Sequence, residues 1–184
     1  MPDLPVCHSG ALIRNPSPLL KKNRLRVKPG MTQKMKVIKG PFPDEFYKKL
    51  LQFTPVPTVD FVVVHDGQFL MGLRKNKPAR GQWWIPGGRI WKGETQAMAI
   101  KRKLKEETGL VPASVKLVGV FDAMFPDSMF GVSNHSITTV YRIKPKTIKV
   151  LKKDSQHGEF QWFKKIDPKW HPYVKEQLRA AGFK

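Results

Sequence analysis

Two adjacent glutamates near the middle of the chain have the residue type and the spacing for chemistry. Glu106 and Glu107 fall at the end of a helix that the pattern predicts over residues 95–108, and Gly109 suits the C-terminus of that helix. Neighbouring carboxylates at a helix end attract a hard cation such as Mg²⁺, which prefers oxygen ligands. A bound cation would offset the negative charge of a diphosphate and stabilise it as a leaving group. These residues therefore predict a divalent-metal site, with Mg²⁺ as the expected ion and Mn²⁺ as an alternative.

The double glycine at residues 87–88 fits the same site, because it permits a tight turn that would bring a backbone carbonyl close to the metal ion. A purely structural interpretation stays open. In it, Glu106 pairs with Arg102 and Glu107 pairs with Lys103 as solvated i,i+4 partners on the helix surface. The two interpretations are compatible, since an arginine can orient a carboxylate that also binds a metal.

A longer pattern surrounds these carboxylates. Gly88 is followed after five residues by Glu94, and after seven more by residues 102–110, Arg-Lys-Leu-Lys-Glu-Glu-Thr-Gly-Leu. This pattern resembles the Nudix box, and Lys103 is its one departure, standing where the family usually has glutamate. The resemblance implies a fold of the α/β class, an α/β/α sandwich with a mixed β-sheet. It also implies a metal-dependent hydrolase that breaks a nucleoside diphosphate away from a second group.

Segments outside the box narrow the resemblance to one branch of the family. Residues 58–64, 72–90 and 154–162 resemble the GDP-mannose mannosyl hydrolases, so the likeness covers about residues 55–165. That branch also lacks the glutamate that Lys103 replaces. The resemblance implies hydrolysis of a nucleotide sugar by attack of water at the anomeric carbon, with release of GDP. GDP-mannose is the first candidate substrate, and GDP-fucose and GDP-glucose come next.

The same resemblance implies roles for individual residues. His157 would be the general base that deprotonates the attacking water, which suits a group that titrates near neutral pH. Arg74 and Arg89 would neutralise the departing diphosphate, and Asp60 would contact substrate. The implied Mg²⁺ ligands are the Gly87 carbonyl, the Glu107 carboxylate and the Gln156 side chain. Glu106, the second carboxylate at the helix end, is a further candidate ligand because of its position beside Glu107.

Three features depart from this branch: Glu106 is retained, residues 122–134 are shorter than the corresponding substrate loop, and Ser136 replaces an expected tyrosine. Glu106 favours an alternative, a Nudix pyrophosphatase that cleaves the P–O–P bridge, whereas Lys103, Gln156 and His157 oppose it. A second alternative is a catalytically inactive nucleotide- or nucleic-acid-binding module. The basic composition favours that module, and the retained box opposes it.

The composition bears on partners and compartment. The formal charge of +20 favours polyanions such as nucleic acid, phosphorylated small molecules or an acidic membrane surface. We expect a nucleotide sugar as the main partner, with nucleic acid as an alternative. No apolar run approaches about 18 residues and the N-terminal residues lack a secretory pattern, so we expect a cytoplasmic protein without a membrane span. The single Cys7 excludes an intrachain disulfide, and the family resemblance suggests a homodimer.

Two regions are predicted along the chain. Residues 1–34 carry seven Lys and Arg against one Asp, and five prolines interrupt them. We interpret them as a basic, disordered leader, and residues 35–184 as the Nudix hydrolase domain. A nucleic-acid arm, an organellar transit peptide and a later translation start at Met31 or Met35 are alternatives for the leader.

Helices and short strands must position the site. A first helix should begin with Asp44 as its cap, with Phe46, Leu50 and Phe53 on its apolar face. A turn at residues 66–67 predicts a β-hairpin. The predicted strands are residues 59–64, 68–73, 83–85 (ended by residues 86–88), 115–121, 137–143 and 160–163, and the last helix covers about residues 172–181.

Two predictions concern burial. On the helix over residues 95–108, Ala97, Ile100 and Leu104 should form one buried stripe, with Glu107 at its edge. The side chains at residues 83–84, both tryptophan, should alternate across the strand, so at least one of them should lie in the core.

Overall fold

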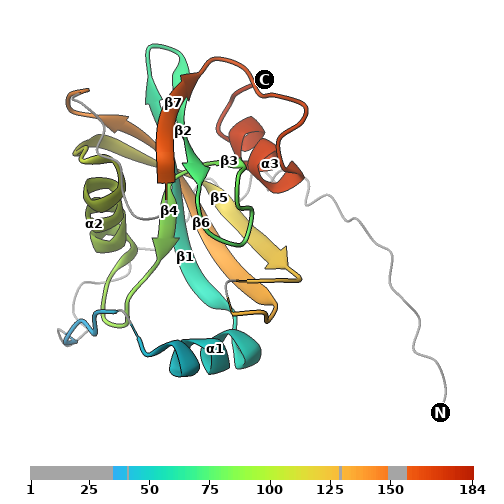
Figure 1. Cartoon of the computed structure of the whole chain (residues 1–184). Helices are drawn as coiled ribbons and strands as arrows, with labels where there is room; N and C mark the ends of the chain where they lie inside the picture. The colour runs from blue at the N-terminus through green and yellow to red at the C-terminus, as the bar shows by residue number, and fades with distance from the viewer. Residues whose placement is uncertain (1–34, 41, 129, 149–156) are drawn as a thin grey trace, which may run out of the picture. The chain divides into compact units, whose positions relative to one another are not determined.

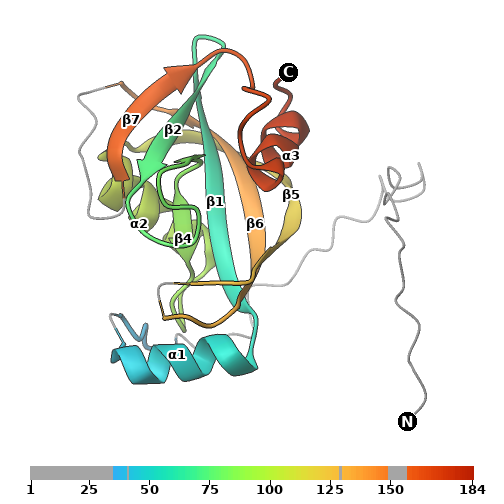
Figure 2. The ribbon, with the colours of Figure 1, turned by 45° about the vertical axis from the view of Figure 1, so that its right-hand side comes forward.

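A mixed β-sheet carries the fold (Figures 1 and 2). The computed structural model describes residues 35–40, 42–128, 130–148 and 157–184. The strands of this part of the chain are β1 Val56–His65, β2 Gln68–Arg74, β3 Trp83–Trp84, β4 Gly87–Arg89, β5 Pro112–Phe125, β6 Asn134–Pro145 and β7 His157–Phe163. They run in the order β3-β2-β1-β6-β5, with β4 paired to β1 and β7 paired to β2. β1 and β6 are parallel, whereas β4 runs antiparallel to β1.

The helices lie on both faces of this sheet and at one end of it (Figures 1 and 2). They are α1 Asp44–Phe53, α2 Gln96–Thr108 and α3 Pro172–Ala180. Successive residues of a strand point to opposite faces. Accordingly, Phe61 of β1 packs in one core cluster with Leu104 of α2, and Val62 packs in the other with Leu178 of α3. The predicted α/β/α sandwich with a mixed sheet is confirmed.

The hairpin and the box helix form where the sequence predicts them. Asp66 and Gly67 both have positive φ, 45° and 72°, as a two-residue hairpin turn requires. At the start of α2, the Thr95 side chain accepts a hydrogen bond from the Met98 amide at 3.2 Å. At its end, Gly109 is left-handed with φ 74°.

The buried face of α2 differs from the predicted stripe. Ala97 is exposed, and Ala99 takes its place beside Ile100 and Leu104. The reason is that this face continues through two charged residues, Lys103 and Glu107, which are also buried. A stripe chosen by apolar residues alone was therefore rotated away from the face that meets the sheet.

The first helix also differs from its prediction. Asp44 is the first helical residue and not the cap, which is Pro43 and makes no side-chain cap bond. Phe46 and Phe53 are exposed, and Leu51 is the buried residue of the helix. Because α1 lies at the end of the sheet and not across its face (Figure 2), it buries a narrower surface than an amphipathic helix on a sheet would.

Several strand boundaries shift because pairing partners decide them. The segment expected to end the tryptophan strand instead contributes β4, whose Gly87 pairs with Asp60 of β1. β5 continues to Phe125, four residues beyond its predicted end, because it pairs with β6 along that whole stretch. β7 begins at His157, three residues earlier than predicted.

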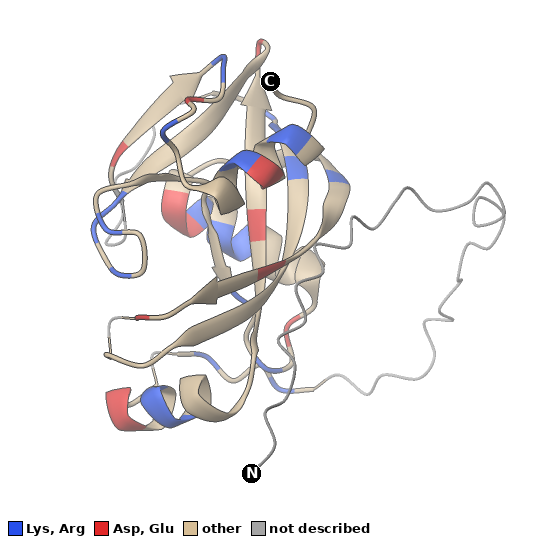
Figure 3. Cartoon of the chain, turned by 90° about the vertical axis from the view of Figure 1, so that its right-hand side faces the viewer, with Lys and Arg blue, Asp and Glu red and all other residues tan. Residues whose placement is uncertain are grey.

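Lys and Arg lie on the helices, strands and loops of the domain and are not confined to one element (Figure 3). Residues 35–184 form one compact unit, whereas the predicted leader, residues 1–34, lies outside the described residues. None of the described helices has the length and apolar character needed to cross a membrane.

Candidate active site

A cavity of about 440 Å³ opens where β1, β4, α1, α2 and the loop after β2 meet. It brings together five residues that the sequence analysis selected from separate segments. Asp60, Arg74, Gly87, Arg89 and Glu106 all line it. Residues spread over 47 positions of the sequence therefore share one space, as a substrate site requires.

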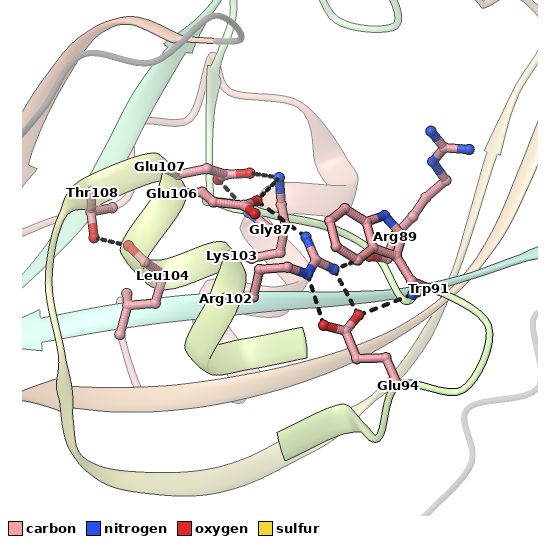
Figure 4. A network of polar contacts seen from close by, with 10 residues as sticks. All are labelled: Gly87, Arg89, Trp91, Glu94, Arg102, Lys103, Leu104, Glu106, Glu107 and Thr108. Carbon is pink, nitrogen blue, oxygen red and sulfur yellow. Dashed lines mark hydrogen bonds and ion pairs between the residues drawn. The ribbon is translucent and has the colours of Figure 1, made fainter. Parts of the chain in front are cut away.

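Glu107 lies behind the wall of this cavity, with 1% of its surface exposed. Its Oε2 accepts a hydrogen bond from the Gly87 amide at 2.9 Å, and its Oε1 lies 2.5 Å from the Lys103 ammonium nitrogen (Figure 4). The carboxylate therefore ties the last turn of α2 to β4, and a buried charge is matched by a buried countercharge.

Lys103 is the residue that departs from the family pattern, and it lies between the two glutamates. Its Nζ is 2.5 Å from Glu107 Oε1 and 3.9 Å from Glu106 Oε2. A side chain at Gly88 would clash with it, because a Cβ built there falls 2.7 Å from Lys103 Cε. The predicted Lys103–Glu107 pair forms, but it is buried and not solvated as expected.

Arg102 and Glu94, both in register with the box, form an ion pair that holds the loop after β4 against α2 (Figure 4). The guanidinium donates to both oxygens of Glu94, each at 2.7 Å, and to the Arg89 carbonyl at 2.9 Å. Desolvation opposes ionisation of Glu94, but hydrogen bonds from Arg102 and from the Trp91 amide outweigh it and lower the pKa of that carboxyl. No role for this pair was predicted from the sequence, although the positions of both residues in the box were the signal for one.

Arg74 and Arg89, the two arginines expected to bind the diphosphate, each lie over an aromatic ring. Arg74 lies over the Trp84 ring at 5.8 Å and donates from Nε to the Pro78 carbonyl at 2.9 Å. Arg89 lies 3.8 Å from the centre of the Tyr47 ring. Each guanidinium thus lies within cation–π distance of an aromatic ring while it lines the cavity, and the Arg89–Tyr47 contact is the shorter of the two.

The prediction that at least one of the two adjacent tryptophans lies in the core is confirmed. Trp84 is buried and packs among the residues between the sheet and α3. It also stacks on Tyr173, with ring centres 5.7 Å apart and planes at 23°, and both rings line the cavity. Tyr47 and Tyr173 are site residues that the sequence analysis missed, because nothing in their neighbourhoods indicates that α1 and α3 reach the cavity.

Asp60 is a buried carboxyl in the middle of β1. Burial, and then the negative charge of Glu107, raise its pKa from 3.8 to about 7, although Arg74 and Lys103 oppose the shift. The neighbouring strand approaches so closely that a Cβ at Gly87 would fall 2.1 Å from Asp60 Oδ1.

Asp60→Asn is expected to stabilise the metal-free protein at pH 8 by about 2 kcal/mol and to change its stability much less at pH 4.5. The folded-state pKa is raised, so the stability that Asp60 contributes is full below the unfolded pKa near 3.8 and is lost as the pH rises through about 7. Urea unfolding in EDTA at both pH values measures the difference. The exposed Asp122→Asn is the control, and an equal effect of Asp60→Asn at both pH values would contradict the prediction.

His157 and Gln156 are the two remaining residues that were predicted to belong to the site. His157 opens β7, and its Cα pairs with that of Arg74 on β2, so the backbone of one residue lies beside that of the other. The side chain of His157 and all of Gln156 lie outside the described residues. Their roles stay predictions.

The donor groups fit a metal site that has few protein ligands. Among the described residues, no three His, Cys, Asp or Glu side chains are grouped so as to hold a metal ion by themselves. Glu106 and Glu107 supply carboxylate oxygens, the ligand type that Mg²⁺ prefers, and Mg²⁺ commonly combines one or two carboxylates with water and substrate phosphate. Because the Lys103 ammonium lies between the two carboxylates, an ion bound by both of them has to displace it.

Solved structures of similar fold exist. One is a MutT NUDIX hydrolase from Burkholderia pseudomallei, with a TM-score of 0.60 and 22% identity, covering 69% of this chain and 98% of that one. Another is the NUDIX domain of Shewanella oneidensis NrtR complexed with ADP ribose, with a TM-score of 0.53 and 22% identity, covering 76% and 99%. These likenesses support the fold.

Sequence comparisons identify the family. An ADP-ribose pyrophosphatase of Methanocaldococcus jannaschii is 40% identical over 76 residues, 41% of this chain and 45% of that protein. The low-salt glycan biosynthesis protein Agl8 of Haloferax volcanii is 33% identical over 140 residues, 75% of this chain and 89% of that protein. The NUDIX domain family model matches residues 54–180. With the box in place on α2 and β4, these matches show that the chain belongs to the Nudix hydrolase family.

Proposed function

We propose that this Nudix hydrolase acts on nucleoside diphosphate sugars with Mg²⁺, with GDP-mannose as the first substrate to test. One observation carries the proposal: Arg74 and Arg89, from different strands, line the same cavity as the carboxylate of Glu106. Guanidinium groups bind phosphate oxygens in pairs, and the cavity is large enough for a small ligand. This combination fits a diphosphate that carries a second group.

Two relatives have names that fit the same substrate class. The Haloferax protein is named for glycan biosynthesis, and the Methanocaldococcus protein for cleavage of ADP-ribose, a nucleoside diphosphate joined to a sugar. Both names support a nucleotide sugar as the substrate of this chain. Only the second name specifies a bond, because a pyrophosphatase cleaves the P–O–P bridge.

In the proposed mechanism, Glu107, Glu106, the Gly87 carbonyl and Gln156 would hold the metal ion. A bound ion would supply positive charge that offsets the charge of the diphosphate leaving group. Arg74 and Arg89 grip the phosphate oxygens through two N–H groups each. His157 accepts a proton from the attacking water, and Asp60 contacts the substrate.

Attack at the anomeric carbon is the favoured reaction, and the position of Lys103 supports it. Its ammonium lies within 4 Å of both helix-end carboxylates, so it reduces the negative charge available for several metal ions. The resulting products are GDP and mannose. The alternative is cleavage of the P–O–P bridge, which Glu106 supports because its carboxylate lines the cavity.

Incubation with GDP-mannose and Mg²⁺ in ¹⁸O-labelled water tests the reaction, with products identified by mass spectrometry. GDP and labelled mannose would establish attack at carbon. GMP and mannose 1-phosphate, with the label on phosphate, would establish the pyrophosphatase reaction. If GDP-mannose is not hydrolysed, assays with GDP-fucose, GDP-glucose and ADP-ribose show whether the enzyme acts on a nucleotide sugar with another sugar or base. An assay with RNA tests the nucleic-acid alternative.

His157→Ala is expected to lower kcat by roughly 10²-fold, because a lost general base typically has an effect of that size. The measurement is steady-state hydrolysis of the substrate that these assays identify, over a range of pH. His65→Ala is the control, since His65 is an exposed histidine outside the cavity lining. Equal rates for wild type and His157→Ala would remove His157 from the mechanism.

A further inference from the structure

The aromatic contact to Arg89 comes from a helix that precedes the matched family domain. The family model begins at residue 54, whereas α1 ends at Phe53. Tyr47 of α1 places its ring 3.8 Å from the Arg89 guanidinium and lines the cavity together with it. The cavity wall on this side is therefore supplied by residues outside the family pattern.

Residues 36–38, which precede α1, are fixed against the loop that follows β4. Ile38 forms a β-bridge with Lys92, and a Cβ at Gly93 would fall 2.7 Å from the Lys36 carbonyl oxygen. Gly93 has φ 83°, a conformation that favours glycine. Backbone contacts this close tie residues 36–38 to the loop that follows β4, which is the strand that carries Arg89.

Tyr47 itself is held from both sides. Its ring packs edge-on against Phe130, in the connection between β5 and β6, with centres 5.4 Å apart and planes at 85°. Leu51, one turn further along α1, is buried and lines the same cavity. On the other side, the Arg89 backbone is fixed, because its carbonyl accepts from Arg102 at 2.9 Å.

We propose that Tyr47 is a positioning residue for Arg89 and thereby sets the affinity for the diphosphate. A stacked guanidinium has one face covered, but its N–H edge stays available for two phosphate oxygens. Stacking also removes conformations that a long, unrestrained arginine would otherwise have to give up on binding. The inference rests on the proposed function, in which Arg89 binds the diphosphate.

Binding of GDP and of inorganic pyrophosphate, each with Mg²⁺, tests the inference by isothermal titration calorimetry. Tyr47→Leu, which keeps an apolar side chain against Phe130, is expected to weaken both probes roughly tenfold, the size of a partly desolvated cation–π contact. Tyr47→Phe retains the ring and is expected to restore most of that affinity. Phe46→Ala is the control, since Phe46 is an exposed aromatic residue of the same helix.

A double-mutant cycle with Arg89→Ala tests whether Tyr47 affects diphosphate binding through Arg89. If Tyr47 acts through Arg89, the Tyr47→Leu/Arg89→Ala double variant binds no more weakly than Arg89→Ala alone. With the substrate that wild type hydrolyses, Tyr47→Leu should raise KM with a smaller change in kcat. Fully additive losses in the cycle would overturn the inference.

Failures of the inference and of the proposed function give different results. Tight GDP binding by wild type and equally tight binding by Tyr47→Leu would overturn the inference and leave the proposed function in place. Absence of GDP and pyrophosphate binding by wild type would overturn both. Thermal unfolding of each variant shows whether Tyr47→Leu is folded, and Tyr47→Phe supplies the comparison within the same packing.

Discussion

Glu107→Gln is expected to lower kcat on the order of 10³-fold, equivalent to about 4 kcal/mol, and to weaken activation by Mg²⁺. The carboxylate is 1% exposed and supplies a buried negative charge behind the cavity wall. Glutamine keeps the shape of the side chain, and its amide oxygen can still accept a hydrogen bond from the Gly87 amide. It removes the negative charge that binds a cation. Mg²⁺ titrations of initial rate, with calorimetry of Mg²⁺ binding, measure the effect.

Glu106→Gln is the matched comparison, because Glu106 has the same side chain at the neighbouring position but is about half exposed. We expect a smaller loss from it. Glu107→Gln also leaves the buried Lys103 ammonium without its carboxylate partner, so the double variant Glu107→Gln/Lys103→Met tests folding separately from activity. An unchanged Mg²⁺ dependence in a folded Glu107→Gln protein would refute its assignment as a metal ligand.

Gly87→Ala is expected to lower the free energy of unfolding by about 3 kcal/mol or more and to abolish hydrolysis. A Cβ at this position would fall 2.1 Å from Asp60 Oδ1, 2.5 Å from the Val59 carbonyl oxygen and 2.6 Å from the Asp60 Cα. Two of these are backbone atoms of the central strand β1, which cannot move without disturbing the core. The β1–β4 pairing would therefore open, and the Gly87–Glu107 hydrogen bond would be lost with it.

Urea unfolding followed by tryptophan fluorescence measures this loss. Gly158→Ala is the control, because a Cβ there would meet chiefly the flexible Lys75 side chain, at 3.3 Å. It should leave the free energy of unfolding almost unchanged. Wild-type stability of Gly87→Ala would show that β4 lies further from β1 than the structure places it.

Local signals in the sequence are sufficient where the interaction partners are also local. The Asp66-Gly67 turn, the box helix and its Gly109 terminus depend on interactions within a few residues, and each occurs where predicted. The spacing from Gly88 to Glu94 and Arg102 likewise identified the family before any distance was known. Residues 59–64 of β1, predicted as a strand from their largely apolar run, are buried throughout.

Tertiary structure decided the features that join distant segments. Lys103 was recognisable as a departure from the family pattern, but its burial between Glu106 and Glu107 depends on how α2 packs on the sheet beneath Gly88. Tyr47 gave no sequence signal, because its partner Arg89 lies 42 positions later and meets it only when α1 closes the end of the sheet.

The raised pKa of Asp60 belongs to the same class, since burial by neighbouring strands and the charge of Glu107 cause it. The sequence by itself determined the family, the box helix and the residue types that can bind a metal ion and a diphosphate, because periodicity, caps and spacing are local properties of the chain. Only the tertiary structure decided which of those charges are buried, which are paired and which side chains complete the cavity, because desolvation and Coulomb interaction depend on distance in space and not on distance along the sequence.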